Sequence, residues 1–166
     1  MEELPRFSPG ALLRQLAEAK VDFVVVGGIA AIAHGSPSFT RDLDISYAPH
    51  QENLDRLGRV LVELDARLRG VAEDVPFVPD GRTLRRTRVL TLDTPIGLID
   101  LLAQPDGAPG YEHLKARSVP AQVAGVTVNV ASLEDLIAMK KAAGRPKDLI
   151  AVEELEAIQR LQREMD

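Results

Sequence analysis

Residues 23–45 limit more than any other stretch what this chain can fold into. They begin with the apolar run Phe23–Val26, which contains three valines, and continue directly into the glycine pair Gly27 and Gly28. Branched apolar residues favour a buried strand, and glycine lets a backbone turn sharply and approach a ligand where a side chain would block it. Residues 29–34 then predict a short helix. Its free N–H groups would face the glycines and form a pocket suited to phosphate.

Two aspartates follow the loop after this helix. Asp42 and Asp44 alternate with Leu43 and Ile45, so a strand would hold both carboxylates on one face and both apolar side chains in the core. Parallel carboxylates repel each other unless a cation lies between them, which indicates a site for a divalent metal, Mg²⁺ or Mn²⁺. A turn or a solvated strand face would explain either feature alone. Their order within one short stretch favours a phosphate-and-metal site.

Length and composition are those of an ordinary folded protein. The chain has 166 residues, of which 45% are hydrophobic and 27% are charged. We predict a single domain over residues 1–166, with residues 1–131 as a sheet-containing catalytic core and residues 132–166 as helices packed on it. The chain has no cysteine, which excludes disulfides and thiolate zinc sites.

The remaining composition concerns location and partners. The N-terminus is acidic and interrupted by prolines, and no apolar run approaches the length of a bilayer span, so we predict a cytoplasmic protein without membrane contact. The net charge of -5 disfavours broad non-specific binding to a phosphate backbone, although a local basic patch could still contact RNA.

The periodicity of apolar residues predicts an α/β (α+β) fold, a small mixed sheet flanked by helices with a C-terminal helical layer. The expected helices cover residues 8–20, 50–68, 111–117, 132–144 and 146–165, and the expected strands cover residues 85–93, 96–102, 119–123 and 126–130. A turn is expected at Asp80 and Gly81, after a loop or marginal strand near Phe77 and Val78. The buried stripe expected along the last helix is Leu149, Val152, Leu155, Ile158 and Leu161.

A third acid lies in an apolar strand. Asp100 is the only charged residue between Ile96 and Ala103, and an acid in such surroundings needs a partner or a metal. It either joins the metal site or caps the loop beyond the strand. Asp93 is the weaker competitor, because it stands next to a turn signal.

The glycine pair and the D-x-D pair a dozen residues later resemble the signature of the DNA polymerase β-like nucleotidyltransferase superfamily. The resemblance implies that Gly27 and Gly28 contact a nucleoside triphosphate and that Asp42 and Asp44 hold metal ions. It also implies that Asp100 matches the third carboxylate, which completes the metal site and can accept the proton of the attacking hydroxyl.

A later segment, residues 139–149, reads MKKAAGRPKDL. Together with the double-glycine and D-x-D stretch it resembles the AbiEii-type and MenT-type nucleotidyltransferases, toxins of bacterial toxin–antitoxin pairs. The lysine and aspartate that this family needs for activity fall on Lys140 and Asp148, with Arg145 and Lys147 as accessory basic residues. Two departures are a shorter helical half and glycine where many of these toxins have serine after the first glycine.

The residues expected to act come from both stretches. The expected catalytic residues are Asp42, Asp44, Asp100, Lys140 and Asp148, of which the first three are the metal ligands. The expected nucleotide-binding residues are Gly27, Gly28, Ser36, Thr40, Lys140 and Arg145. The two hydroxyls could donate to phosphate oxygens, although a loop rich in serine and proline needs no function to explain it.

A cluster of arginines has two interpretations that the sequence leaves open. It could meet the triphosphate or an acceptor backbone, or it could be a solvated edge strand guarded by positive charge. The cluster comprises Arg82, Arg85, Arg86 and Arg88.

The expected function is therefore a metal-dependent nucleotidyltransferase that moves an NMP from an NTP, such as ATP, to an acceptor hydroxyl. The acceptor is a tRNA 3′ end, a protein or a small molecule, and a toxin would have a cognate antitoxin protein as partner. The alternative is a catalytically silent domain of the same fold that serves as a binding or antitoxin protein. The intact acids favour the enzyme.

Overall fold

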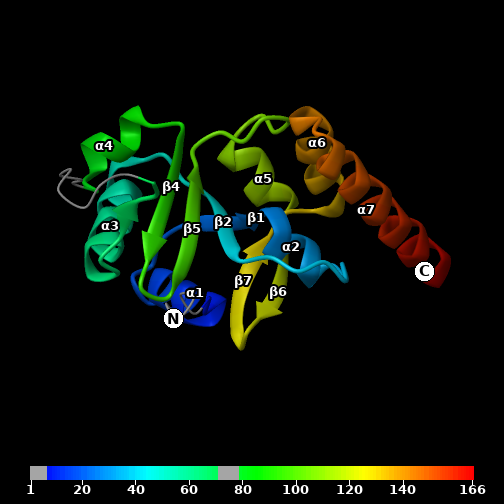
Figure 1. Cartoon of the computed structure of the whole chain (residues 1–166), viewed down its shortest axis with the longest axis horizontal. Coiled ribbons are helices and arrows are strands. Elements are labelled where there is room, and N and C mark those ends of the chain that lie inside the picture. The colour runs from blue at the N-terminus through cyan, green and yellow to red at the C-terminus, as the bar shows by residue number, and fades with distance from the viewer. Residues whose placement is uncertain (1–6, 71–78) are drawn as a thin grey trace.

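A computed structural model describes residues 7–70 and 79–166, so the segment around Phe77 and Val78 lies outside the described residues. Within the described ranges, seven strands form one mixed sheet in the order β3-β4-β5-β2-β1-β7-β6, flanked by helices (Figure 1). The predicted α/β class with a mixed sheet and C-terminal helices is confirmed. The strands are β1 (Phe23–Val26), β2 (Asp42–Tyr47), β3 (Arg67–Leu68), β4 (Val89–Thr94), β5 (Gly97–Leu102), β6 (Val119–Val123) and β7 (Val126–Val130). The helices are α1 (Pro9–Glu18), α2 (Gly27–Ala33), α3 (Gln51–Glu63), α4 (Gly81–Arg86), α5 (Tyr111–Arg117), α6 (Leu133–Ala143) and α7 (Pro146–Met165).

Strand β2 lies at the centre of the sheet and has two neighbours. It pairs antiparallel with β1 and parallel with β5, so that Leu43 lies opposite Ile99 and Ile45 lies opposite Leu101. These four side chains are fully buried. Because neighbouring residues of a strand point to opposite faces, the acidic residues of β2 and β5 project from the other face of the sheet.

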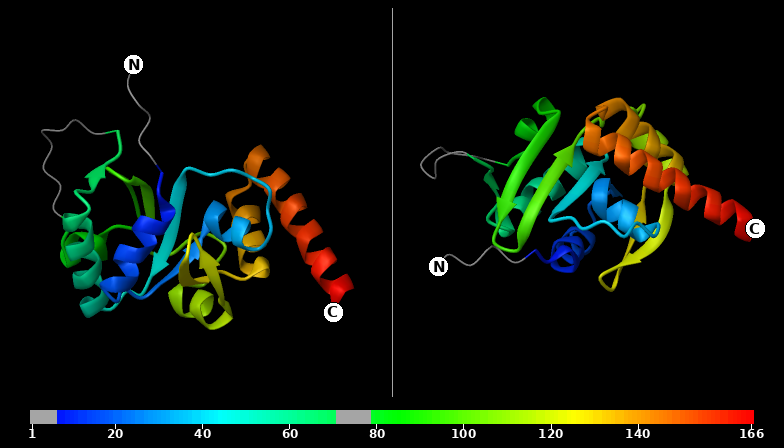
Figure 2. Two further views of the ribbon diagram at one scale, coloured as in Figure 1. Left: turned by 90° about the horizontal axis from the view of Figure 1, so that it is seen from below. Right: turned by 45° about the vertical axis from the view of Figure 1, so that its right-hand side comes forward.

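The helices lie around this sheet as the views of Figure 2 show, with α1 and α3 toward one end and α6 and α7 toward the other. In α1, Leu12, Leu13 and Leu16 are fully buried, as the sequence predicts. The β6–β7 hairpin also has its predicted bounds, and its turn residues Ala124 and Gly125 both have positive φ.

Helix α3 ends at Glu63, so the prediction that it continues to about Leu68 was wrong. Asp65 has a φ of 53°, outside the right-handed helical region. Arg67 and Leu68 then pair with β4 as the short edge strand β3. Pairing with a strand that is distant in sequence cannot be read from local periodicity.

The strand predicted over residues 85–93 was wrong in its first half. Asp80 accepts a hydrogen bond from the Thr83 backbone N–H at 2.8 Å and caps α4, so it begins a helix rather than a turn. The strand begins only at Val89. Arg86, at the end of α4, and Arg88 therefore do not share a strand face.

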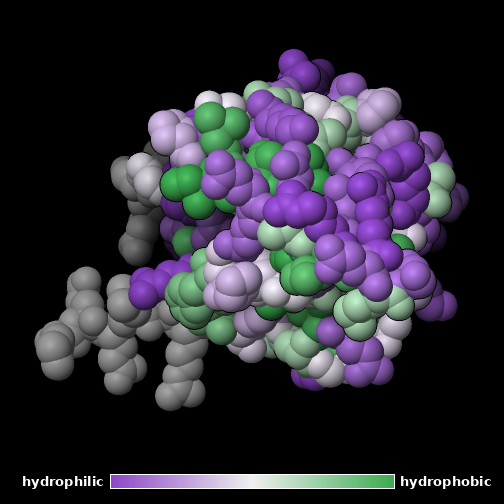
Figure 3. Space-filling view, turned by 90° about the vertical axis from the view of Figure 1, so that its right-hand side faces the viewer, coloured by the Kyte–Doolittle hydropathy of each residue, from purple (hydrophilic) through white to green (hydrophobic). Residues whose placement is uncertain are grey.

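Helix α7 is amphipathic over only part of its length. Val152 and Leu155 are buried and Ile158 is partly buried, but Leu149 is 52% exposed and Leu161 is 59% exposed, which corrects two of the predicted core positions. The second half of the helix extends beyond the sheet (Figure 1). On this side of the molecule the surface is largely hydrophilic, with hydrophobic side chains in small groups (Figure 3). No helix in the described residues is long and apolar enough to cross a membrane.

Asn53 links α3 to the start of β1 and the end of β2. Its side chain accepts from the Asp22 N–H at 2.7 Å and donates to the carbonyls of Asp22 and Ala48 at 3.0 and 2.9 Å. We expect Asn53→Ala to lower the free energy of unfolding by about 3 kcal/mol, because it removes three hydrogen bonds to the backbone and takes away the side-chain donor of the buried Ala48 carbonyl. Urea denaturation measures this, with the exposed Gln162→Ala as control. A loss below about 1 kcal/mol for Asn53→Ala would contradict it.

Candidate metal and nucleotide site

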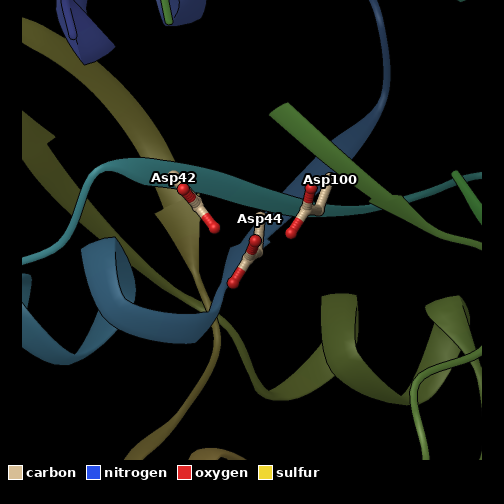
Figure 4. Close-up of side chains that lie close together, drawn as sticks. All are labelled: Asp42, Asp44 and Asp100. Carbon is tan, nitrogen blue, oxygen red and sulfur yellow. The ribbon is translucent and has the colours of Figure 1, made fainter. Parts of the chain in front are cut away.

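Three carboxylates converge on the open face of the sheet. Asp42 and Asp44 extend from β2, and Asp100 extends from β5 directly opposite Asp44 (Figure 4). One carboxylate oxygen from each lies within 4.8 Å of the others. The side chains of Asp42 and Asp100 are 37% and 18% exposed, so solvent reaches the cluster from one side.

Asp44 is the member of this cluster whose charge is least compensated. Burial, followed by the negative charges of Asp100 and Asp42, raises its pKa to about 7, while the positive charge of Lys140 lowers it. Its Oδ1 is buried and has no hydrogen-bond partner among the described residues. An unpartnered carboxylate oxygen beside two further carboxylates fits a divalent cation with oxygen ligands. The three acids therefore have the chemistry that such a cation requires.

The glycine pair is shaped around these acids. Gly27 has a φ of +67°, and a Cβ at this position would lie 2.0 Å from Asp44 Oδ2. At Gly28 a Cβ would lie 2.9 Å from the Cβ of Thr40. Helix α2 begins at Gly27 rather than at residue 29. The glycines are therefore its first turn, and a side chain at either position would force Asp44 or Thr40 to move.

A second group of charged residues comes from the turn between α6 and α7. The Asp148 side chain is 1% exposed and accepts from Arg145 Nε at 2.6 Å, from Arg145 Nη2 at 3.2 Å and from Lys140 Nζ at 3.4 Å. The side-chain hydrogen bonds from Arg145 are the main reason that the pKa of Asp148 is lowered to about 2. Asp148 therefore holds the two basic side chains in place as a permanently charged anchor.

Two clefts meet at Asp44, Lys140, Arg145 and Asp148, which line both. One has a volume of about 470 Å³ and a largely apolar lining from the β4–β5 region and α6, including Val89, Leu102, Pro105, Leu136 and Met139. The other has a volume of about 450 Å³ and a polar lining, including Ser36, Ser38, Thr40, Lys147 and Glu154. A donor and an acceptor could therefore approach the acids from separate sides.

The hydroxyl groups of the loop between α2 and β2 form hydrogen bonds within the protein. Ser36 donates to Glu154 on α7, Ser38 donates to the same carboxylate at 3.2 Å, and the Asp42 backbone N–H donates to Thr40 Oγ1 at 3.3 Å. Ser36 is buried. Its hydroxyl ties the loop to α7, a role that sequence reasoning missed because Glu154 is one of many acids along that helix.

Arg69 is the other residue that sequence reasoning missed. Its guanidinium lies 2.9 Å from Asp100, 3.2 Å from Asp93 and 3.9 Å from Asp42. Asp93, the competitor for the third acid, thus pairs with Arg69, and Asp100 joins the cluster. No local signal marks Arg69, which directly follows the short strand β3 and precedes Gly70.

The four arginines of residues 82–88 do not act together. Arg82, Arg85 and Arg86 line a separate cavity with Gln51, and Arg85 donates to the Gln51 side chain. Arg88 lines the apolar cleft beside Asp44. The interpretation as a guarded edge strand does not hold for the first three, because they lie on α4.

The sequence matches one protein family over most of its length. The profile of the family described as nucleotidyl transferase AbiEii toxin, type IV TA system, matches residues 11–150. No curated protein matches the chain with significance.

Several solved structures share the fold at low identity. The lincosamide antibiotic adenylyltransferase LnuA, bound to lincomycin, has a TM-score of 0.62 and 13% identity and covers 92% of this chain and 99% of its own. ANT(2″)-Ia, in complex with adenylyl-2″-tobramycin, has a TM-score of 0.56 and 16% identity, with 95% of both chains covered. The nucleotidyltransferase TM1012 from Thermotoga maritima has a TM-score of 0.52 and 17% identity, and the match covers 94% of this chain and 91% of that one.

The closeness of Gly27 to Asp44 can be tested by adding one methyl group. We expect Gly27→Ala to weaken Mn²⁺ binding at least about tenfold, because the new Cβ would displace the Asp44 carboxylate. Gly35→Ala is the matched control: Gly35 also has a positive φ, of +111°, but a Cβ there would meet nothing within 4 Å. Isothermal titration with Mn²⁺ measures both variants. Equal weakening in the two would show that backbone strain, not the carboxylate, is responsible.

The raised pKa of Asp44 has a consequence for stability. Above about pH 7 the Asp44 carboxylate of the folded protein is ionised although burial and two neighbouring carboxylates disfavour its charge. In the unfolded chain the same group ionises in water without this penalty. The penalty is absent below about pH 4, grows as the pH rises to about 7 and is constant above that. In metal-free buffer with chelator, Asp44→Asn should therefore raise the free energy of unfolding at pH 8 by on the order of 2 kcal/mol.

Urea denaturation at pH 4.5 and pH 8 measures the effect, with Asp106→Asn, at an exposed loop position, as control. A gain for Asp44→Asn that is the same at both pH values would contradict the electrostatic explanation.

Proposed function

Because the chain belongs to the AbiEii nucleotidyltransferase toxin family, and is thus a nucleotidyltransferase, we propose that it transfers an NMP from an NTP to an acceptor hydroxyl with the help of a divalent metal. The observation that carries the proposal is the acid cluster. Asp42, Asp44 and Asp100 bring their oxygens within 4.8 Å of one another, beside two clefts that share Lys140 and Arg145.

The metal ligands are Asp42, Asp44 and Asp100, and the ion is Mg²⁺ or Mn²⁺. The partnerless Oδ1 of Asp44 supports this assignment. When bound, the cation supplies positive charge to the phosphate oxygens during transfer. Asp44, with a pKa of about 7 in the metal-free protein, is the ligand whose negative charge gains most from such a neighbour.

The polar cleft is the proposed site of the triphosphate. Gly28, at the start of α2, lines this cleft together with Lys140 and Arg145, and the adjacent Gly27 lines the neighbouring apolar cleft. These donors would orient the phosphates and neutralise the departing pyrophosphate. Asp148 acts as a positioning residue, since it is buried and holds both basic side chains.

The reaction itself requires little covalent chemistry from the protein. An acceptor hydroxyl oxygen forms a bond to the α-phosphorus, the bond to the β–α bridging oxygen breaks, and pyrophosphate leaves. The proton of the hydroxyl passes to a carboxylate of the cluster, for which Asp100 is the candidate because it is less buried than Asp44.

The hydroxyls of Ser36 and Thr40 support the loop that lines the polar cleft, since they already bond to Glu154 and to β2.

The acceptor is proposed to enter through the apolar cleft, where Arg88 lies at the edge. The candidates are a tRNA 3′ end, a protein hydroxyl and a small molecule. As a member of a toxin family, the protein would act in the cytoplasm and would have a cognate antitoxin as partner.

A transfer assay tests the function. The protein is incubated with each labelled NTP, Mg²⁺ or Mn²⁺, and total tRNA or cell protein. We expect label to enter one acceptor class, and Asp44→Asn to lower the rate at least about 1,000-fold, because it removes a metal ligand. Lys140→Ala should lower the rate at least about tenfold.

Lys141→Ala is the matched control for Lys140→Ala. Lys141 is the adjacent residue, but it pairs with Glu156 outside the site, so its removal should leave the rate unchanged. Transfer that persists in Asp44→Asn would refute the metal-site assignment. Absence of transfer to any acceptor, together with absence of metal-dependent NTP binding, would favour a silent domain.

A further inference from the structure

The acid cluster has a resident positive charge. The guanidinium of Arg69 donates from Nη2 to Asp100 Oδ1 at 2.9 Å, and its Nη1 lies 3.9 Å from Asp42 Oδ2. It thus contacts two of the three carboxylates that face one another. A cation and a guanidinium that share the same oxygens repel each other and compete for them.

Arg69 does not depend on those two acids for its position. Its Nε donates to Asp93 at 3.2 Å and its Nη2 donates to the Leu92 carbonyl at 3.3 Å, both on β4. Its backbone N–H also donates to the Thr91 carbonyl at 3.0 Å. The side chain is therefore anchored on β4 and presents one edge of its guanidinium to the cluster.

The surroundings leave Arg69 as the nearest balancing charge on this side. The basic side chains Lys140 and Arg145 bind Asp148 on α7 instead. Arg67, two residues before Arg69, pairs with Asp65 and is 57% exposed. Asp42 and Asp100 therefore share Arg69 and no other arginine or lysine among the described residues.

We propose that Arg69 is a positioning residue that holds Asp100 in place in the metal-free enzyme and sets the metal affinity by competing for the same carboxylates. The inference rests on the proposed metal role of the acids. When the divalent cation binds, the guanidinium gives up part of its contact with Asp100 and stays on Asp93 and the Leu92 carbonyl. Without metal, Arg69 compensates part of the negative charge of the acids. With metal, its positive charge keeps the cation from binding too tightly.

The test measures Mn²⁺ binding to the full chain by electron paramagnetic resonance of the free ion. Arg69→Gln should tighten Mn²⁺ binding at least about threefold, because a positive charge next to the ligands is removed. Arg67→Gln is the matched control, since it removes the same charge two residues away and should leave the affinity unchanged. Arg69→Lys keeps the charge and should leave the affinity within about twofold of the wild type.

Turnover separates positioning from competition. At saturating Mn²⁺, Arg69→Gln should lower kcat several-fold, because Asp100 loses its donor, while Arg69→Lys restores part of the rate. Unchanged or weaker Mn²⁺ binding in a folded Arg69→Gln protein overturns the proposal, even if nucleotidyl transfer is intact. Tighter Mn²⁺ binding without any transfer activity supports Arg69's role and overturns the proposed function instead. A wild-type protein that does not bind Mn²⁺ overturns both.

Discussion

The structure depends on the parallel pairing of β2 with β5, which sets Asp44 directly opposite Asp100. On one face this register closes the core through Leu43, Ile45, Ile99 and Leu101, and on the other it forces like charges together. A slip by one residue would send the acids into the core and the leucines and isoleucines to the cleft. Burial of the apolar side chains on one face of the sheet therefore stabilises the unfavourable cluster of carboxylates on the other face. The carboxylates stay together because another register of β2 and β5 would disrupt the core.

The cost of that arrangement is concentrated at Asp44. Burial of its carboxylate, together with the negative charges of Asp100 and Asp42, raises the pKa of Asp44 to about 7. Arg69 relieves Asp100 and Asp42 from one side, and Lys140 relieves Asp44 from the other. Neither pairs directly with Asp44 Oδ1. This incomplete compensation suits the proposed metal role, because full pairing of the acids would leave little electrostatic gain for a bound cation.

Local pattern was sufficient where local forces decide the structure. The strand Phe23–Val26, the turn of the β6–β7 hairpin and the capped ends of α6 follow from glycine, branched residues and a serine cap, and the sequence predicted each of them. It also predicted the three acids as a group. It missed α4 and the early end of α3, which depend on the cap by Asp80 and on pairing with β4. Arg69 and Glu154 were missed because their significance lies entirely in contacts with residues distant in the chain.

The two charged halves of the site differ in how they are held. In the basic half the charged side chains pair with one another. Gly144 turns the chain with a φ of 65°, and Arg145 caps α7. The buried Asp148 accepts hydrogen bonds from both Lys140 and Arg145. These side chains are already paired with one another in the absence of a ligand. The acidic half keeps a partnerless oxygen and shares an arginine that has other anchors. In the proposed reaction, ion exchange would therefore belong to the strands β2 and β5, and the α6–α7 turn would provide the basic groups that position the phosphates.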